Sequence, residues 1–311
     1  MGPRLLGLII EIIDFFFFFF YIFFIIFSFL SMSFFTLMEQ KIIGSSQLRY
    51  GPYYRGFLGI LQPFCDAVKL YRKFNKIIFV FSNFIFNLLP YLLLVLFNFL
   101  WLLRPILFIS FDITLGVFFF LLILSISALI ILMISWFSNC KYSILGGLRS
   151  VSQIISYEVC LGFIFLCICF LTKSLNLLRL GEYNGFLVLA FLPIFFIWIF
   201  TILAERNRTP FDFVEGEREL VSGFNTEYSG GPFALCFMRE YISMLFISFI
   251  RFFLFFFYSF LLGLSAVFFC FVYILVRCFL PRYRYDKLML FCWKMLLPLL
   301  IIFLFCLSRF F

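Results

Sequence analysis

The sequence predicts an all-α membrane protein with about eight transmembrane helices and one amphipathic surface helix. Three observations predict this fold. Hydrophobic residues make up 65% of the 311 positions, and the mean hydropathy is +1.16. Charged residues make up only 13%, where soluble domains have about 25%. Basic residues also gather in alternate loops, as described below. We therefore expect residues 1–311 to form a single polytopic membrane domain.

The expected spans follow from the length of apolar sequence that a helix needs to cross a bilayer, about 20 residues. Five stretches contain no Asp, Glu, Lys or Arg: 15–38, 77–103, 113–140, 183–204 and 252–276. Three further spans contain charged residues or border them: about 150–172, 232–250 and 288–308. Only Arg251 separates the sixth span from the seventh, so this boundary is the least well defined.

The distribution of basic residues gives the orientation. In an eight-span arrangement, 18 of the 24 Lys and Arg residues fall in the loops after spans one, three, five and seven, or at the adjoining helix ends. Such an excess marks the cytoplasmic or matrix side of a membrane. We therefore expect the loops 39–76 and 204–231 on that side, and both chain termini on the opposite side.

The first loop contains the pattern of an amphipathic helix. Apolar residues recur at steps of three and four: Phe57, Leu61, Phe64, Val68 and Tyr71. Polar residues follow the same rhythm on another face: Gln62, Asp66, Lys69, Lys73 and Lys76. Pro63 suits the first turn of such a helix. This pattern predicts a helix at the membrane surface. Such a helix could serve as a simple interfacial anchor, with no further function.

Acidic residues concentrate in the loop that follows the fifth span. Residues 204–228 hold six acids and three arginines in a protein of net charge +9. Thr209 and Pro210 resemble a helix start, and a short helix there would place Asp212, Glu215 and Glu219 on one face. The alternative is a solvated loop whose acids pair with its own arginines.

Two further acids, Glu158 and Glu240, lie within hydrophobic spans. A charged side chain at the centre of a bilayer costs about 2.5–3.5 kcal/mol on insertion scales, so such residues are functional candidates. Proton relay is the leading role, and a structural pair with Arg149 or Arg239 is the alternative.

Residue types that hold redox centres are scarce. The chain has no histidine, and its ten cysteines are scattered without a C-x-x-C motif. Because haem, iron–sulfur and zinc sites usually depend on these ligands, we expect no bound metal or haem in this chain. We also expect no bound flavin and no catalytic residue. The N-terminal MGPRLLGLIIEIID matches neither a transit peptide nor a cleaved signal, so we expect no processing there.

Four stretches together resemble a known family over about residues 38–298. They are EQKIIGSSQLRYGPYYRGFLGILQPFCDAVKL, LRSVSQIISYEV, AERNRTPFDFVEGERELVSGFNTEYSGGPFAL and PRYRYDKLM, in chain order. They are similar to NADH dehydrogenase subunit 1, the quinone-chamber membrane subunit of respiratory complex I. One departure is Glu39-Gln40-Lys41, where the family usually has Glu-Arg-Lys.

The resemblance implies an eight-helix fold whose matrix loops wall a tunnel for ubiquinone, the substrate, in a proton-pumping NADH:ubiquinone oxidoreductase. By matching motif positions, it implies these quinone-tunnel residues: Arg49, Asp66, Phe224, Glu227, Tyr228, Arg282 and Arg284. It also implies a proton path formed by Glu158, Glu205, Asp212, Glu215, Glu219 and Glu240.

The expected partners are other complex I subunits, including the iron–sulfur hydrophilic arm and adjacent membrane subunits, together with membrane lipids and no nucleic acid. The expected location is the mitochondrial inner membrane, with both termini on the intermembrane-space side. The alternatives are the membrane anchor of a hydrogenase-type complex, a secondary transporter and a structural scaffold. A transporter of this kind should contain two repeated halves, and residues 1–155 and 156–311 show no self-similarity.

Overall fold

The computed structural model describes residues 2–73, 82–103, 113–182, 192–212, 223–255 and 262–310. Its α-helices are α1 (Gly2–Ser46), α2 (Gln62–Arg72), α3 (Ser82–Leu100), α4 (Gly116–Phe137), α5 (Lys141–Thr172), α6 (Leu177–Glu182), α8 (Leu192–Glu205), α10 (Gly230–Phe255), α11 (Leu262–Phe279), α12 (Tyr285–Phe291) and α13 (Leu297–Phe310). A π-helical turn, Cys292–Leu296, joins α12 to α13. No β-strand occurs in these ranges, so the all-α prediction is confirmed.

The helices agree with the expected spans. Five are long and apolar enough to cross a membrane: Ile25–Ser46 within α1, then α4, α5, the Gly230–Arg251 part of α10, and Tyr285–Arg309. Shorter apolar helices lie in α3, α8 and α11. Each of the eight expected spans therefore contains an apolar helix in the described part of the chain.

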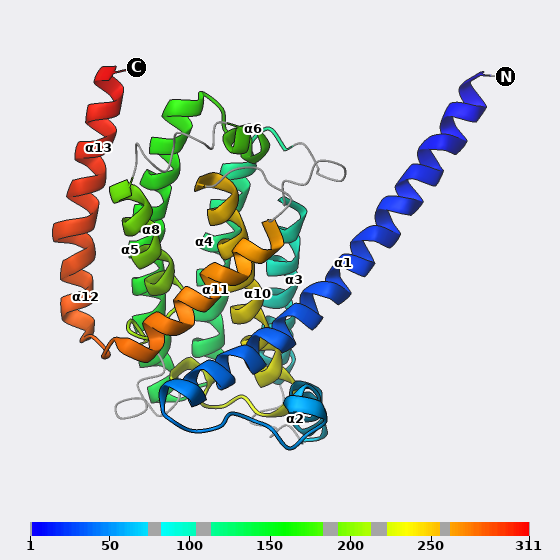
Figure 1. Ribbon diagram of the computed structural model, residues 1–311, viewed down its shortest axis with the longest axis vertical. Helices are drawn as coiled ribbons and strands as arrows, with labels where there is room; N and C mark the ends of the chain where they lie inside the picture. Colours follow the sequence, from blue (N-terminus) through cyan, green and yellow to red (C-terminus); the bar gives the residue numbers. More distant parts are fainter. Residues whose placement is uncertain are drawn as a thin grey trace.

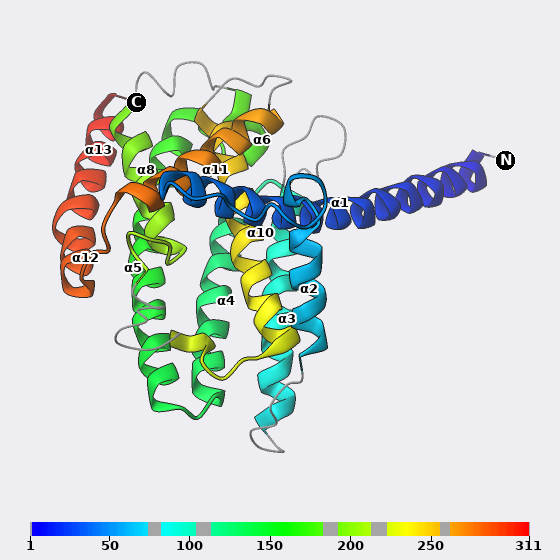
Figure 2. The ribbon, with the colours of Figure 1, turned by 60° about the horizontal axis from the view of Figure 1, so that its bottom comes forward.

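The helices form a bundle, and α1 and α2 lie at its periphery (Figure 1). α5 packs against α4, α8 and α13, while α10 packs against α3 and α11. α1 crosses the bundle obliquely, and its N-terminal part extends away from the other helices (Figures 1 and 2). The amphipathic helix α2 packs against α1 and α10, as Figure 2 shows from below.

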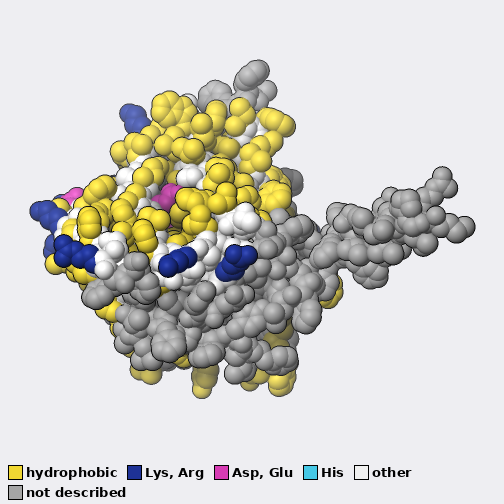
Figure 3. Space-filling view, turned by 90° about the horizontal axis from the view of Figure 1, so that it is seen from above, with side chains coloured by type: hydrophobic (Ala, Val, Ile, Leu, Met, Phe, Trp, Pro, Cys, Tyr) yellow, Lys and Arg dark blue, Asp and Glu magenta, His cyan; other side chains and the backbone are white. Residues whose placement is uncertain are grey.

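Aromatic side chains fill the interior of the bundle. The rings of Phe120 and Phe165 lie 5.4 Å apart, and Trp198 contacts Phe165 with a ring separation of 5.1 Å. These side chains are almost fully buried, whereas Phe305 on α13 is 65% exposed. The described surface seen from above is mostly hydrophobic, with Lys and Arg side chains at the left of the view and near its middle (Figure 3).

Several helix ends differ from the expected boundaries, and at two of them a charged side chain is buried in the fold. α1 continues beyond residue 38 to Ser46 because Glu39 is buried against basic partners. α10 continues through Arg251 to Phe255. The Arg251 side chain is fully buried, and its guanidinium lies 4.3 Å from the ring centres of both Phe195 and Phe269. The charge at each position is therefore accommodated inside the fold and does not begin a loop.

Candidate functional site

Glu39 of α1 is the centre of a buried group of charges. Its side chain is 8% exposed and forms ion pairs with Arg277 of α11 and, at 3.5 Å, with Arg208. The Tyr241 hydroxyl of α10 donates a hydrogen bond to Glu39 Oε2 at 2.7 Å. Four segments that are distant in the sequence therefore meet at one carboxylate.

Arg208 joins Glu39 to the acid of α10. Its Nη2 lies 3.8 Å from a carboxylate oxygen of Glu240, and its guanidinium lies over the Tyr241 ring at 4.5 Å. Burial lowers the pKa of Arg208, but the Tyr241 hydroxyl, Glu39 and Glu240 together raise that pKa above its ordinary value. Arg208 therefore remains charged and bridges the two acids.

Two further arginines extend the group into the bundle. Arg206 lies 3.5 Å from Glu205, and the guanidiniums of Arg206 and Arg239 approach the Phe97 ring at 5.1 and 4.8 Å. Burial lowers the pKa of Arg206, an effect that Glu205 and then Glu240 oppose. We call the residues that share this region the buried charge cluster: Glu39, Glu205, Arg206, Arg208, Arg239 and Glu240.

Several polar atoms of the buried charge cluster have no hydrogen-bond partner among the described residues. They include both carboxylate oxygens of Glu205, Nε and Nη2 of Arg206, and Nε of Arg239. Buried polar groups are nearly always hydrogen-bonded in proteins, and ordered water usually satisfies those that protein atoms do not. The chemistry of this region therefore suits an internal chain of water molecules.

Asp212 lies at the edge of the cluster. The residue is buried, and its carboxylate pairs at 3.3 Å with Arg282, whose side chain is 40% exposed. The Tyr283 amide donates to the Pro210 carbonyl at 3.0 Å, which holds the connection between α11 and α12 against the start of the acidic loop. The expected helix start is wrong, because Thr209 and Pro210 form a turn and the chain through Asp212 is not helical; Glu215 and Glu219 lie outside the described residues.

Two of the other expected proton-path residues lie in the buried charge cluster, and a third lies on α5. Glu205 and Glu240 belong to the buried charge cluster. Glu240 pairs with Arg208, a partner that the sequence pattern did not suggest. Glu158 lies on α5, half-buried, and no ion pair to it occurs within the described part of the chain.

The far end of the acidic loop docks on α5. A Cβ atom on Gly146 would lie 2.8 Å from the Gly223 Cα, so the two backbones meet where a side chain has no room. Ser143 Oγ donates to the Phe224 carbonyl at 3.3 Å. This contact fixes the chain immediately before α10.

Tyr228 is packed inside the fold. Its ring stacks on Phe86 at 4.1 Å, and its hydroxyl donates to the Phe86 carbonyl at 2.8 Å. Burial raises the pKa of Tyr228 above its ordinary value. Phe224 is also buried, and Glu227 is half-buried.

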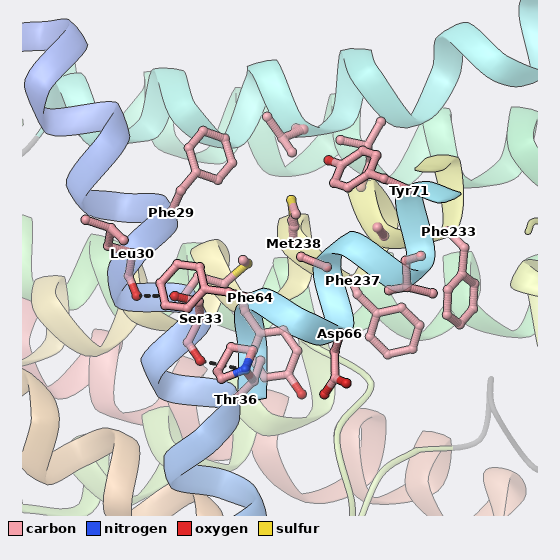
Figure 4. Close-up of a pocket in the computed structure, with 18 of the residues that line it drawn as sticks. Phe29, Leu30, Ser33, Thr36, Phe64, Asp66, Tyr71, Phe233, Phe237 and Met238 are labelled. Atoms are coloured by element: carbon pink, nitrogen blue, oxygen red, sulfur yellow. Dashed lines mark hydrogen bonds between the residues drawn. The ribbon is translucent and has the colours of Figure 1, made fainter. Parts of the chain in front are cut away.

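A cavity of about 710 Å³ lies between α1, α2 and α10 (Figure 4). Apolar side chains from all three helices form most of its wall, among them Phe29, Phe64 and Met238. The hydroxyls of Ser33 and Thr36 also line it but donate to carbonyls of their own helix. Pockets of about 300–1,000 Å³ with few polar groups are typical of small-molecule sites.

Two residues connect this cavity to charged groups. Asp66 of α2 lines it, and the Gln62 amide holds both carboxylate oxygens at 2.9 Å. Tyr241 also lines the cavity while its hydroxyl donates to Glu39. A ligand in the cavity would therefore lie one side chain away from the buried charge cluster.

Of the seven expected quinone-tunnel residues, Asp66 lines this cavity and the others lie elsewhere. Arg49 is exposed and donates from Nε to Gln47 at 2.8 Å. Arg284 is exposed and pairs with Asp286 at 3.0 Å.

Sequence reasoning missed the residues that complete the site. Glu39 and Tyr241 were not among the expected site residues, although Glu39 is an acid at the end of an apolar stretch, which is a usable signal. Arg277 gave no such signal. Among the described residues, no three His, Cys, Asp or Glu side chains converge in a way that could hold a metal ion.

Comparison with known proteins gives the family. The sequence model of the NADH dehydrogenase family matches residues 19–308. NADH-ubiquinone oxidoreductase chain 1 of Anopheles gambiae is 45% identical over 282 residues, which cover 89% of this chain and 90% of the relative. The chain 1 proteins of Artemia franciscana and Paracentrotus lividus are 47% and 39% identical over 289 residues each; these matches cover 88% and 87% of this chain, and 92% and 88% of the relatives. The chain therefore belongs to the NADH dehydrogenase family.

Proposed function

We propose that this chain is the quinone-chamber membrane subunit of a proton-translocating NADH:ubiquinone oxidoreductase in the mitochondrial inner membrane. The names of its relatives and its apolar helices support the assignment to such an enzyme. In this proposal the cavity between α1, α2 and α10 admits ubiquinone. The buried charge cluster then passes the response to quinone reduction toward the proton path.

The position of Tyr241 carries this proposal. Its ring borders an apolar cavity, its hydroxyl binds Glu39, and its face carries the Arg208 guanidinium. Reducing a quinone adds two electrons before two protons complete the quinol, so negative charge appears transiently near the headgroup. In a poorly hydrated interior such a charge acts several times more strongly than in water. Tyr241 and Arg208 would transmit that change to Glu39 and Glu240.

The composition of the buried charge cluster supports proton movement. Its acids are separated by single arginines, so protonation of one acid alters the balance of charge at the next. Water is expected at the atoms of Glu205 and Arg206 that form no hydrogen bond among the described residues, and a chain of water molecules conducts protons. We include Asp212, Glu158 and the remaining acids of the loop, Glu215 and Glu219, in this path.

Partners must supply the electrons, because the proposal assigns no redox centre to this chain. We propose that iron–sulfur subunits of the hydrophilic arm dock over the matrix-side loops and that adjacent membrane subunits receive the proton signal. In Figure 1 both chain ends lie at the top and α2 lies at the bottom, which fits termini on the intermembrane-space side.

A photoreactive ubiquinone analogue tests the quinone site in the purified complex. We expect light-induced labelling on the cavity segments of α1, α2 and α10, and excess ubiquinone should suppress it. Labelling confined to other segments would refute the cavity assignment. NADH-dependent quinone reduction by the same preparation distinguishes this function from a hydrogenase-type membrane anchor, which would lack the NADH-oxidising partners.

Neutralising the acid on α5 tests the proton path separately. We expect Glu158→Gln to leave the complex assembled while lowering quinone-linked turnover and proton pumping. An assembled variant with unchanged turnover and pumping would remove Glu158 from the path.

A further inference from the structure

Two thiols meet inside the interface between α5 and the C-terminal helices. Cys160 lies on α5, and Cys292 begins the π-helical turn between α12 and α13. Their Sγ atoms are 3.5 Å apart, and both side chains are fully buried. Both cysteines are free, and neither belongs to the cavity or to the buried charge cluster. α12 and α13 lie along the side of α5, as Figure 1 shows.

The surroundings keep the two sulfur atoms facing each other. Cys292 donates from Sγ to the Ser156 carbonyl at 3.5 Å, which leaves its lone pairs available toward Cys160. On the N-terminal side of this point, two hydrogen bonds join α5 to α12. Tyr157 donates to the Leu288 carbonyl at 3.2 Å, and the hydroxyls of Ser152 and Tyr285 lie 2.7 Å apart.

The distance between the thiols is short enough for a covalent bond. A disulfide has an S–S length of about 2.05 Å, so the sulfur atoms must approach by about 1.5 Å. The π-helical turn at Cys292 provides a place for that movement, because such turns contain an extra residue and recur at functional positions in helices.

We propose that Cys160 and Cys292 form a redox-active dithiol that a hydroperoxide converts to a disulfide between α5 and the C-terminal helices. Hydrogen peroxide is the simplest such oxidant because it is small, neutral and able to cross membranes. One sulfur attacks a peroxide oxygen, the O–O bond breaks, and a sulfenic acid and water form. The second sulfur then attacks the sulfenic sulfur, the S–O bond breaks, and a second water leaves. The two sulfur atoms are oxidised, and the peroxide is reduced to two water molecules.

Other cysteines of the chain provide internal controls. Cys167 and Cys169 lie on the same helix and are also buried, but no hydrogen bond joins either to a second cysteine within the described residues. Their rate of oxidation shows how fast a thiol buried in α5 reacts when it is not hydrogen-bonded to a second cysteine. Cys306 on α13 is exposed and reports peroxide that reaches the surface of the chain.

The test uses the intact complex without substitutions. The complex is treated with increasing hydrogen peroxide, quenched in acid, unfolded, alkylated, digested and analysed by mass spectrometry. We expect a linked peptide pair containing Cys160 and Cys292, lighter by two hydrogen atoms and separated by a reductant, while Cys167 and Cys169 remain alkylated. Two results would overturn the proposal: a pair that stays fully alkylated when Cys306 is oxidised, and a pair oxidised no faster than Cys167 and Cys169.

A Cys292→Ser complex adds a second measurement. We expect it to lose the linked peptide and to accumulate the sulfenic acid at Cys160, trapped with dimedone. A linked peptide between Cys160 and another cysteine in this variant would show that the facing arrangement is not what selects the partner, which contradicts the proposal.

Discussion

Replacing Tyr241 by phenylalanine removes one hydroxyl and leaves the ring in place. The ring can still carry the Arg208 guanidinium at 4.5 Å and contact Phe35 at 5.5 Å, so the packing between α1 and α10 should be retained. What is lost is the hydroxyl, with its 2.7 Å hydrogen bond to Glu39 and its interaction with Arg208. A hydrogen bond to a charged group contributes about 1.5–3 kcal/mol.

That free energy sets the expected loss of activity. If the hydroxyl links the cavity to Glu39 during turnover, the full free energy of this hydrogen bond is lost from the coupling step. Each 1.36 kcal/mol corresponds to about a tenfold change in rate, so quinone-linked turnover should fall by about ten- to a hundredfold. The retained ring should keep the subunit assembled in the complex.

The assay compares NADH-driven ubiquinone reduction with NADH oxidation by a water-soluble artificial acceptor in the same membranes. The first activity needs the quinone site, and the second needs only the hydrophilic arm. Tyr273→Phe is the matched control, because Tyr273 is also buried and its hydroxyl accepts a hydrogen bond from Arg251 at 3.1 Å, away from the cavity. Equal losses of quinone reduction in the two variants, or no loss in Tyr241→Phe, would refute the reasoning.

Three further predictions concern the site and its support. Glu39→Gln leaves Arg208 and the partly exposed Arg277 with less counter-charge and should destabilise the subunit by at most about 3–5 kcal/mol, seen as a lower yield of assembled complex; adding Arg277→Gln should recover part of that yield, and no recovery would contradict the pairing. Gly146→Ala places a methyl group 2.8 Å from a backbone atom and should cost about 1–3 kcal/mol in thermal stability. Gly162→Ala on the same helix has open space and should cost less, so equal costs would argue against the close approach. Asp212→Asn should leave the complex assembled but slow quinone reduction, and unchanged turnover and pumping would exclude Asp212 from the path.

The helices could be predicted from the sequence because lipid imposes a simple rule on composition. Long apolar stretches gave the spans, and the recurrence of apolar residues around Phe64 gave α2, which begins at Gln62 with Pro63 in its first turn. Helix ends were less predictable. A charge inside a span, such as Arg251, resembles a loop in the sequence, although here aromatic rings hold it within the bundle.

The site could be predicted only in part, because its contacts depend on packing between distant segments. Glu205 and Glu240 are notable in the sequence as acids beside or within apolar stretches, and they do lie in one cluster. The partners of Glu39 are harder to predict from the sequence, since Arg208 and Arg277 follow it by 169 and 238 residues. Nothing local in the chain indicates that these side chains meet.

The enclosure of Arg251 makes three helices dependent on one another. Phe195 of α8 and Phe269 of α11 both contact its guanidinium, and such cation–π contacts compensate in part for the loss of hydration. Lysine cannot replace this arginine, because a compact ammonium keeps its water more strongly and has no flat face to stack on a ring. Across relatives we therefore expect positions 195, 251 and 269 to covary, with an uncharged residue at 251 wherever either ring is missing.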